Sequence, residues 1–302
     1  MFKKKSINLE AVFWILLCKS SFVLMMALNK HSSLPTLEIN FCRSFLIMVI
    51  TAVLIASNKK LTFKTGNPKL QFFKVSIGAF GMVGYFYGFR YLEMAHATTL
   101  DFSQTLILPL FAIFFLKEKI NCQRILALLI GYTGILIAVN PFSGSFEKAE
   151  AVMLIAAVCG AFAVVMAKKL TAKDSLFLLM FYSGVATAGL LGVYYMIPGA
   201  PLFETQGEWV ALTWDDIPFF VQLIVVSFIM QYSYLKAYSL ADVGFLAPFN
   251  YTKFFISVLF SLFLFHQVPA LETFFGAILI ISSTFYLTKK ELHQEPQYHY
   301  KE

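Results

Sequence analysis

Four ionisable side chains lie deep inside long apolar runs of the sequence, at Lys19, Arg43, Asp101 and Lys253. If these runs cross a membrane, a central charge costs at least about 2.5 to 3.5 kcal/mol, so it should face a polar partner or a water-filled cavity. A lysine stem of about 6 Å is too short to carry either lysine's charge to the headgroups. Neither lysine has an acid at its own depth. Both therefore predict recognition of an anion, or of a zwitterion with a carboxylate.

Arg43 and Asp101 are expected at a similar depth, roughly 10 Å from the outer face at about 1.5 Å of rise per residue. Opposite charges at one depth can form a structural ion pair, which offsets much of the cost of burying them. We predict this pair. The alternative is that Asp101 pairs with Lys253, which lies on a neighbouring polar face.

Lys253 belongs to a polar helical face. Asn250 precedes it by three residues, so both side chains lie on one side of a helix. Pro248 lacks an amide donor and is expected to loosen the helix just before them. Asp101 and Gln104 give an equivalent polar face to an earlier apolar run. Two such faces indicate a binding site between helices.

Aromatic side chains are the remaining candidates, although packing is their commoner role in a chain with 34 Phe and 14 Tyr. Tyr85 and Tyr234 are favoured over Tyr87, Tyr232 and Tyr251, because each lies within a helical turn of a polar position. The complete set of predicted substrate-binding residues is Lys19, Arg43, Tyr85, Asp101, Gln104, Gln231, Tyr234, Asn250 and Lys253.

Motifs for covalent chemistry are missing from the sequence. It contains no GxSxG, HExxH or phosphate-loop pattern, and its five histidines are not spaced as metal ligands beside carboxylates. The four cysteines lie singly, without a CxxC spacing, and are expected to be small buried hydrophobic residues. We predict no enzyme activity, no cofactor and no metal site.

The composition identifies the elements that must position these residues. Hydrophobic residues make up 59% of the chain and charged residues only 14%, whereas soluble domains have about 25% charged residues. Runs of about 20 apolar residues are long enough to cross a bilayer. The sequence predicts ten such helices and no soluble domain, at residues 8–29, 36–57, 70–92, 95–116, 122–140, 149–168, 175–197, 216–238, 241–265 and 268–288.

Basic residues near the ends of these helices predict the orientation, because Lys and Arg are retained on the cytoplasmic side. With the N-terminus inside, the outer face keeps only Lys30, Arg90 and Lys148. Both termini are then cytoplasmic, and residues 291–302 are expected to be a disordered cytoplasmic tail. The FKKK start is followed by no cleavage site, so the first helix is predicted to be retained. The net charge of +7 reflects this topology, and nucleic acid is not an expected partner.

The chain repeats itself. YFYGFRYLEMAHATTL (85–100) aligns with QYSYLKAYSLADVGFL (231–246), which pairs Arg90 with Lys236 and Ala95 with Ala241. Each half has five helices. After five crossings the chain is on the side of the membrane opposite to its start, so the second half enters the membrane from that side. We predict an all-α membrane protein of two inverted repeats, residues 1–141 and 149–290, the plan of secondary transporters with midplane sites.

Several motifs resemble the drug/metabolite transporter superfamily and its ten-helix EamA-type members. These are Arg43 in PTLEINFCRSFL, the segments YGFRYLEMA and YLKAYSLAD, and the hairpin formed by FLKEKI and GYTGILIAVNP. The second half departs from that pattern at Gln267 and Ser283. A weaker likeness is to S-adenosylmethionine uptake carriers, although Met26 and VVMA (164–167) stand where those carriers place an Asp.

Residues and resemblance together predict a carrier of a small organic solute that works by alternating access in the cytoplasmic membrane. Its partners would be the lipid bilayer, the solute and, where transport is coupled, an ion. The first alternative is a transporter of S-adenosylmethionine or of another cationic metabolite or drug. The second is a membrane-embedded binding or assembly protein without transport. Saturable, competable flux in proteoliposomes separates a carrier from an assembly protein.

Overall fold

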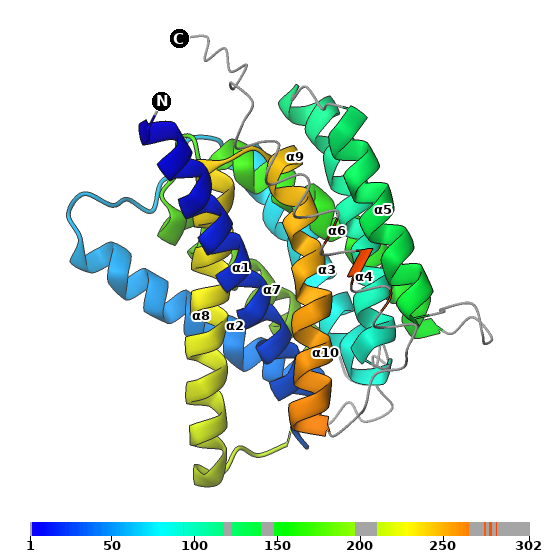
Figure 1. Cartoon of the computed structure of the whole chain (residues 1–302). Helices are drawn as coiled ribbons and strands as arrows, with labels where there is room; N and C mark the ends of the chain where they lie inside the picture. The colour runs from blue at the N-terminus through cyan, green and yellow to red at the C-terminus, as the bar shows by residue number, and fades with distance from the viewer. Residues whose placement is uncertain are drawn as a thin grey trace.

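The structure is a computed structural model that describes residues 2–92, 94–117, 122–139, 148–196 and 210–265, together with residues 275, 278, 279 and 282. Within them every regular element is helical (Figure 1). The long helices of the first half are α1 (Phe2–His31), α2 (Thr36–Ser57), α3 (Pro68–Tyr91), α4 (Met94–Phe111), with the π-helical turn η1 (Ala112–Leu116), and α5 (Cys122–Val139). Those of the second half are α6 (Lys148–Leu170), α7 (Leu176–Met196), η2 (Trp214–Asp216) with α8 (Ile217–Leu240), and α9 (Val243–Leu246), η3 (Ala247–Tyr251) and α10 (Thr252–Phe265).

Nine of the ten predicted membrane helices coincide with these elements to within a few residues, apart from the first, which begins earlier. Eight segments of the described residues are long and apolar enough to span a membrane. They are α1, α2, α3, α4 with η1, α6, α7, η2 with α8, and the α9–α10 segment; α5 is not among them. The tenth predicted helix, 268–288, lies almost entirely outside the described residues.

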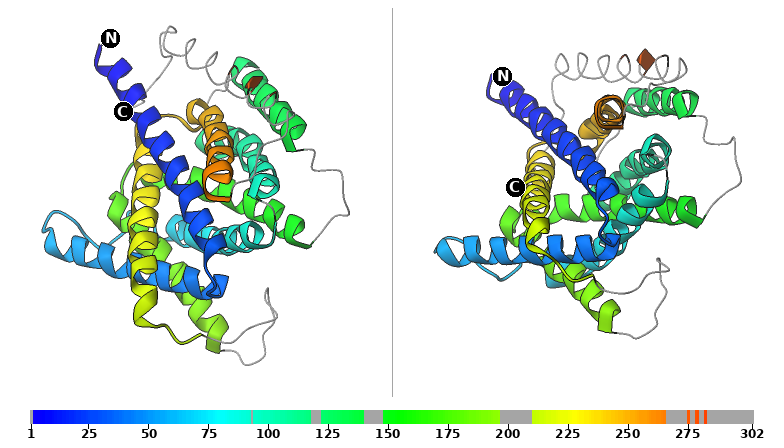
Figure 2. Two further views of the ribbon diagram at one scale, coloured as in Figure 1. Left: turned by 60° about the horizontal axis from the view of Figure 1, so that its bottom comes forward. Right: turned by 90° about the horizontal axis from the view of Figure 1, so that it is seen from below.

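The packing of the helices follows the two halves of the chain. α3 packs along α6, α1 packs along α8, and α2 packs against α7. The two halves correspond helix by helix, so that α1, α2 and α3 match α6, α7 and α8. Under this correspondence the α3–α6 contact is equivalent to the α8–α1 contact. The α2–α7 contact maps onto itself. α1 lies between α8 and α10 in Figure 1, and Figure 2 shows the same neighbours in two further views. The packing is consistent with two repeats.

Glycines of α3 allow α6 to approach closely. A Cβ at Gly81 would lie 3.0 Å from the Cβ of Cys159, and one at Gly84 would lie 2.9 Å from the Cβ of Ala156. At Gly88 it would lie 2.6 Å from the sulfur of Met153. Small residues at these positions therefore let the backbones of the two helices pack closely.

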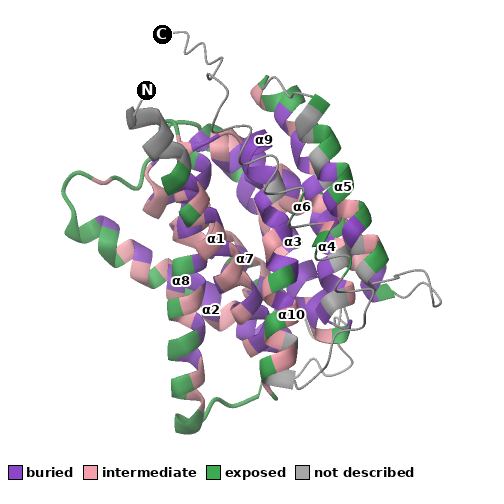
Figure 3. Ribbon diagram, in the orientation of Figure 1, coloured by how far each residue is buried: buried purple, intermediate pink, exposed green. Residues whose placement is uncertain are grey.

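Large apolar side chains cover the outside of the helix bundle as well as its centre. Phe72, Phe80, Phe114 and Val221 are all more than half exposed. Buried residues instead lie along the faces that point into the bundle (Figure 3). Exposed apolar side chains on membrane-length helices are what lipid contact requires, because lipid tails are as apolar as the side chains.

Two carboxylates join the halves at opposite ends of the bundle. The carboxylate of Asp174, in the α6–α7 connection, accepts hydrogen bonds from the Gly66 N–H (2.8 Å) and the Thr65 hydroxyl. Glu38, near the start of α2, accepts one from the Val210 N–H (3.1 Å), just before α8. Each carboxylate lies after the first helix of its own half, α6 for Asp174 and α1 for Glu38. Each accepts its hydrogen bonds from the loop that follows the second helix of the other half. We call these contacts the Asp174 clamp and the Glu38 clamp.

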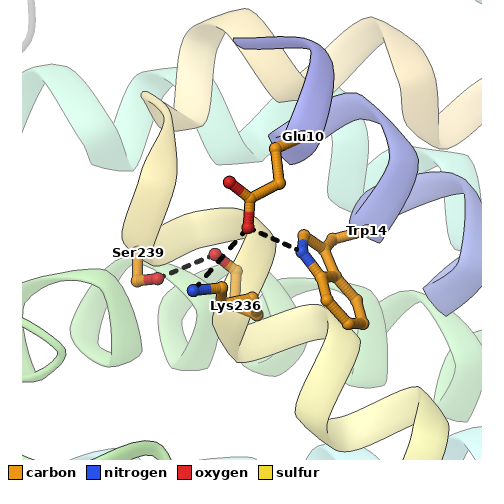
Figure 4. A network of polar contacts seen from close by, with 4 residues as sticks. All are labelled: Glu10, Trp14, Lys236 and Ser239. Carbon is orange, nitrogen blue, oxygen red and sulfur yellow. Dashed lines mark hydrogen bonds and ion pairs between the residues drawn. The ribbon is translucent and has the colours of Figure 1, made fainter. Parts of the chain in front are cut away.

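A third contact between the halves joins α1 to α8. The Trp14 indole N–H donates to Glu10 Oε1 (3.2 Å), and Lys236 Nζ lies 3.8 Å from the same oxygen (Figure 4). The Ser239 hydroxyl donates to the carbonyl oxygen of Lys236 (2.7 Å). Because Glu10 and Lys236 are partly exposed, this ion pair contributes at most about 1 kcal/mol. It is a contact that the two halves can break easily.

Candidate functional site

A cavity of about 170 Å³ lies in the middle of the bundle, between helices of both halves. Eight of the nine predicted site residues line it: Lys19, Arg43, Tyr85, Asp101, Gln104, Gln231, Tyr234 and Lys253. They come from α1, α2, α3, α4, α8 and α10. The ninth, Asn250, is buried in η3 but does not line the cavity. That these residues bind a substrate stays a prediction.

The central polar contact of the cavity is an ion pair between Lys253 of α10 and Asp101 of α4. The side chains are only 2% and 1% exposed. The ammonium also faces the ring of Phe102, with 4.7 Å from Nζ to the ring centroid, and that of Phe22, at 5.7 Å. The pair therefore joins the first half of the chain to the second at the site itself.

This ion pair corrects two sequence predictions. Arg43 was expected to pair with Asp101, and Lys253 was expected to have no acid at its own depth. In the structure Arg43 donates instead to Asn40 Oδ1 (2.8 Å) and Ser44 Oγ (3.1 Å), within its own helix. Asp101 is the partner of Lys253. Counting residues along a helix gives a depth, but it does not show which way a side chain points.

The ninth apolar run, which carries Lys253, is interrupted just before this residue. Residues 243–265 do not form one helix but a short α9, the 3₁₀ turn η3 and α10. Pro248 lies within η3, where the sequence predicted a loosened helix. Its missing amide donor makes a regular α-helix unfavourable there. Lys253 follows in the first turn of α10, beside the interruption.

Gly160 of α6 makes room for two of the polar groups. A Cβ at this position would lie 2.7 Å from Gln104 Nε2 and 2.9 Å from the Tyr85 hydroxyl oxygen. Both polar groups and Gly160 line the cavity. The Tyr85 oxygen and Asp101 Oδ1 are buried and make no hydrogen bond of standard geometry in the described part of the chain, although the Tyr85 and Asp101 side chains lie close enough to interact. Buried polar atoms normally have a partner, so these two atoms are candidates to bind a ligand or ordered water.

The aromatic candidates that the sequence favoured are the ones that line the cavity. Tyr85 and Tyr234 line the cavity, whereas Tyr87, Tyr232 and Tyr251 do not. Tyr232 packs edge-on against Trp14, and the Tyr251 hydroxyl donates to the carbonyl oxygen of Leu128 (2.6 Å). These two are packing residues.

Lys74 is the cavity residue that the sequence reasoning missed. It lies only a few residues after the start of α3, where a lysine ordinarily reaches the headgroups. In the structure it is 6% exposed and donates to the carbonyl oxygen of Leu179 (3.2 Å) and to Ser183 Oγ (2.6 Å) of α7. Helical spacing could have identified it, because Lys74, Gly78, Gly81 and Tyr85 lie along one face of α3 and all line the cavity.

The cavity has a marked excess of positive charge. Its described lining contains four basic side chains, Lys19, Arg43, Lys74 and Lys253, and one carboxylate, that of Asp101. One cation is paired with that carboxylate. A cavity with three further cations favours an anionic guest over a cationic one. Among the described residues there is no group of His, Cys, Asp and Glu that could hold a metal ion.

Comparison with known sequences adds a family match. The sequence model of the EamA-like transporter family matches this chain twice, at residues 9–140 and 147–289. The two matches together span nearly the whole chain and coincide with its two helical halves. The duplication inferred from the sequence is thereby confirmed.

Named relatives are similar over almost their full length. The chain is 27% identical to an S-adenosylmethionine uptake transporter of Rickettsia bellii, covering 92% of this chain and 93% of that protein. It is 26% identical to a riboflavin transporter of Brucella anthropi (86% and 90% covered) and 28% identical to a pseudopaline exporter of Pseudomonas aeruginosa (93% and 96%). A solved crystal structure, 16% identical, superposes with a TM-score of 0.71 over 94% of this chain and 98% of the other, which shows a shared fold.

Proposed function

Because the chain belongs to the EamA-like transporter family, we propose that it moves a small organic anion or zwitterion across the cytoplasmic membrane by alternating access. Like its family and its named relatives, the chain is a multi-pass membrane transporter of small metabolites. It is not an enzyme. The observation that supports the substrate class is the central cavity, whose described lining contains four cations and one carboxylate. An anionic group on the substrate would offset charges that are otherwise costly to bury.

The second candidate substrate is S-adenosylmethionine or another cationic metabolite, because relatives at 25% to 27% identity are named S-adenosylmethionine uptake transporters. S-adenosylmethionine carries a carboxylate that the cations could hold. Its sulfonium, however, would find only Asp101 among the described acids of the cavity, and that carboxylate is already paired with Lys253. The charge of the cavity therefore favours the anion or zwitterion without a second positive group.

Alternating access is supported by the contacts between the halves. The Asp174 clamp and the Glu38 clamp lie at opposite ends of the bundle and occupy equivalent positions in the two repeats. If the repeats are inverted, opening one clamp and closing the other exchanges equivalent states. Transport would then proceed by release of one clamp at a time around the central cavity.

Flux in proteoliposomes tests the proposal directly. The purified chain should give saturable uptake of an organic acid or amino acid that excess unlabelled solute abolishes. Protein-free liposomes provide the background rate. Saturable uptake of S-adenosylmethionine with no competition by anions would favour the second candidate, and absence of carrier-dependent flux for every solute class would support an assembly protein.

Surface labelling tests the orientation, which stays a prediction. In a variant without native cysteines, a cysteine at Val210 should react with an impermeant maleimide added to intact cells, and one at Lys64 should react only after lysis. Both positions are exposed. Removing the native thiols matters because Cys122 is exposed, contrary to the sequence expectation. The reverse labelling pattern would place the N-terminus outside.

Replacing Gly160 with alanine is expected to lower transport and leave folding nearly intact. The new methyl group would crowd the ends of Gln104 and Tyr85. The flexible Gln104 side chain can shift at little cost, whereas the Tyr85 ring would have to tilt as a unit. Shifting them narrows the cavity. The matched control is Gly189→Ala, since a Cβ at Gly189 meets nothing within 4 Å. Uptake and melting temperature should separate the two variants, and equal uptake by both would show that Gly160 does not shape the site.

A further inference from the structure

Two basic side chains of the cavity belong to helices that pack against the same stretch of α7. Lys74, from α3, donates a hydrogen bond of 2.6 Å to Ser183 Oγ. Arg43 belongs to α2, and the carbonyl oxygen of the next residue, Ser44, lies 2.9 Å from the position of a Cβ at Gly184. Ser183 and Gly184 are adjacent, so α2 and α3 both contact α7 at this level. Arg43, Ser44, Lys74 and Ser183 all line the cavity, as does Thr187 one turn along α7.

Arg43 is almost completely buried, with 1% of its surface exposed, and its contacts are neutral. One Nη donates to Asn40 Oδ1 and Ser44 Oγ, and the guanidinium faces the Phe86 ring, 5.2 Å from its centroid. Nε and the other Nη have no hydrogen-bond partner among the described residues. A guanidinium normally uses its planar set of donors on carboxylate or phosphate oxygens.

Lys74, like Arg43, is a buried cation whose contacts are neutral groups. Its two hydrogen bonds go to a carbonyl oxygen and a hydroxyl, neither of which carries a charge. A buried cation without a counter-charge destabilises the protein that contains it. A protein that needed only packing here would be more stable with apolar residues of similar size.

We infer that Arg43 and Lys74 form an oxyanion subsite of the cavity, which binds a carboxylate or phosphate group of the substrate. The inference rests on the proposed function and makes it more specific. The Thr187 hydroxyl lines the same part of the cavity and is a further candidate donor, whereas the Ser183 and Ser44 hydroxyls already donate to the Leu179 carbonyl oxygen (2.7 Å) and to Asn40 Oδ1 (3.5 Å). The remainder of the substrate extends through the cavity toward the Lys253–Asp101 pair. Lys74 and Arg43 are then specificity-determining residues, and a solute without an acid group is excluded.

Binding of two simple probes tests the subsite without knowledge of the natural substrate. The purified full-length protein would be melted in increasing sodium glutarate or inorganic phosphate, with sodium chloride at equal ionic strength as reference. A ligand that binds only the folded state raises the melting temperature saturably. We expect at least one probe to do so. A response to glutarate indicates a carboxylate group on the substrate, and a response to phosphate indicates a phosphoryl group.

Arg43→Gln is expected to raise the dissociation constant of that probe by about ten-fold or more, because the substitution removes a charge-assisted contact. The empty variant should melt no lower than the parent, because an uncompensated charge has been removed. Lys74→Met should behave in the same way. Arg90→Gln is the matched control, since Arg90 donates 2.7 Å hydrogen bonds to the carbonyl oxygens of Asn29 and Ser32. It should lower the melting temperature and leave probe binding unchanged.

Three results would overturn the subsite. These are no saturable response of the parent protein to either probe, unchanged binding in Arg43→Gln and Lys74→Met, or an empty Arg43→Gln protein as destabilised as Arg90→Gln. The last would show that Arg43 is structural. Failure of the proposed function is a different result: probes bind and the variants weaken them, but no solute is carried across proteoliposomes.

Discussion

The Lys253→Met variant is expected to be markedly less stable than the parent protein, and adding Asp101→Asn is expected to restore most of the loss. Removing the lysine leaves the Asp101 carboxylate buried at 1% exposure without its counter-charge. Breaking one partner of a buried ion pair typically costs about 3 to 5 kcal/mol, whereas replacing both partners is often close to neutral. Asp101→Asn alone should also destabilise, since it leaves Lys253 unpaired.

The measurement is a double-mutant cycle on detergent-solubilised protein, with uptake assayed on the same variants. The control is Lys19→Met, the same substitution on a cavity residue for which the described structure gives no ion pair. It should change stability little. Losses that add in the double variant would show that the two side chains do not meet.

Transport should not recover in the double variant, even where stability does. The pair joins α4 of one half to α10 of the other, at the wall of the cavity. An anionic substrate competes with Asp101 for the lysine, so the strength of the pair can respond to occupancy. Full uptake by a stable double variant would make the pair purely structural.

The sequence predicted the helices well because the signal for a membrane helix is mostly length and apolarity. Nine helices agree with the structure on that basis alone. The depth of Lys19, Arg43, Asp101 and Lys253 was also informative, since all four line one cavity. A charge in an apolar helix must point away from lipid, and a bundle has only one interior.

The sequence left the partner of Asp101 open between Arg43 and Lys253. Depth along a helix leaves its rotation and its interruptions undetermined, and the 3₁₀ turn η3 before Lys253 changes both. Lys74 was missed because a lysine near the start of an apolar run resembles one that reaches the headgroups. The Asp174 and Glu38 clamps could not be read from the sequence, because their donors include backbone N–H groups, which every residue but proline has.

A disulfide across the Asp174 clamp is expected to stop transport completely and reversibly. A Cβ at Gly66 would lie 3.3 Å from the Cβ of Lys173, close to the separation of about 3.5 to 4.5 Å found in disulfides. Both residues are exposed, so oxidants and reductants can reach them. Gly66 belongs to the α2–α3 loop of the first half and Lys173 to the α6–α7 connection of the second.

The experiment is uptake by the Gly66→Cys/Lys173→Cys variant before oxidation, after oxidation and after reduction with dithiothreitol. If the clamp must open once in each cycle, the cross-linked protein retains the binding cavity but cannot release the solute on that side. Uptake should fall to background on oxidation and return on reduction, while probe binding persists. Each single-cysteine variant, treated identically, controls for oxidation of the native cysteines. Undiminished uptake by fully cross-linked protein would mean that the halves do not separate at this clamp, and that the solute leaves the cavity by another route.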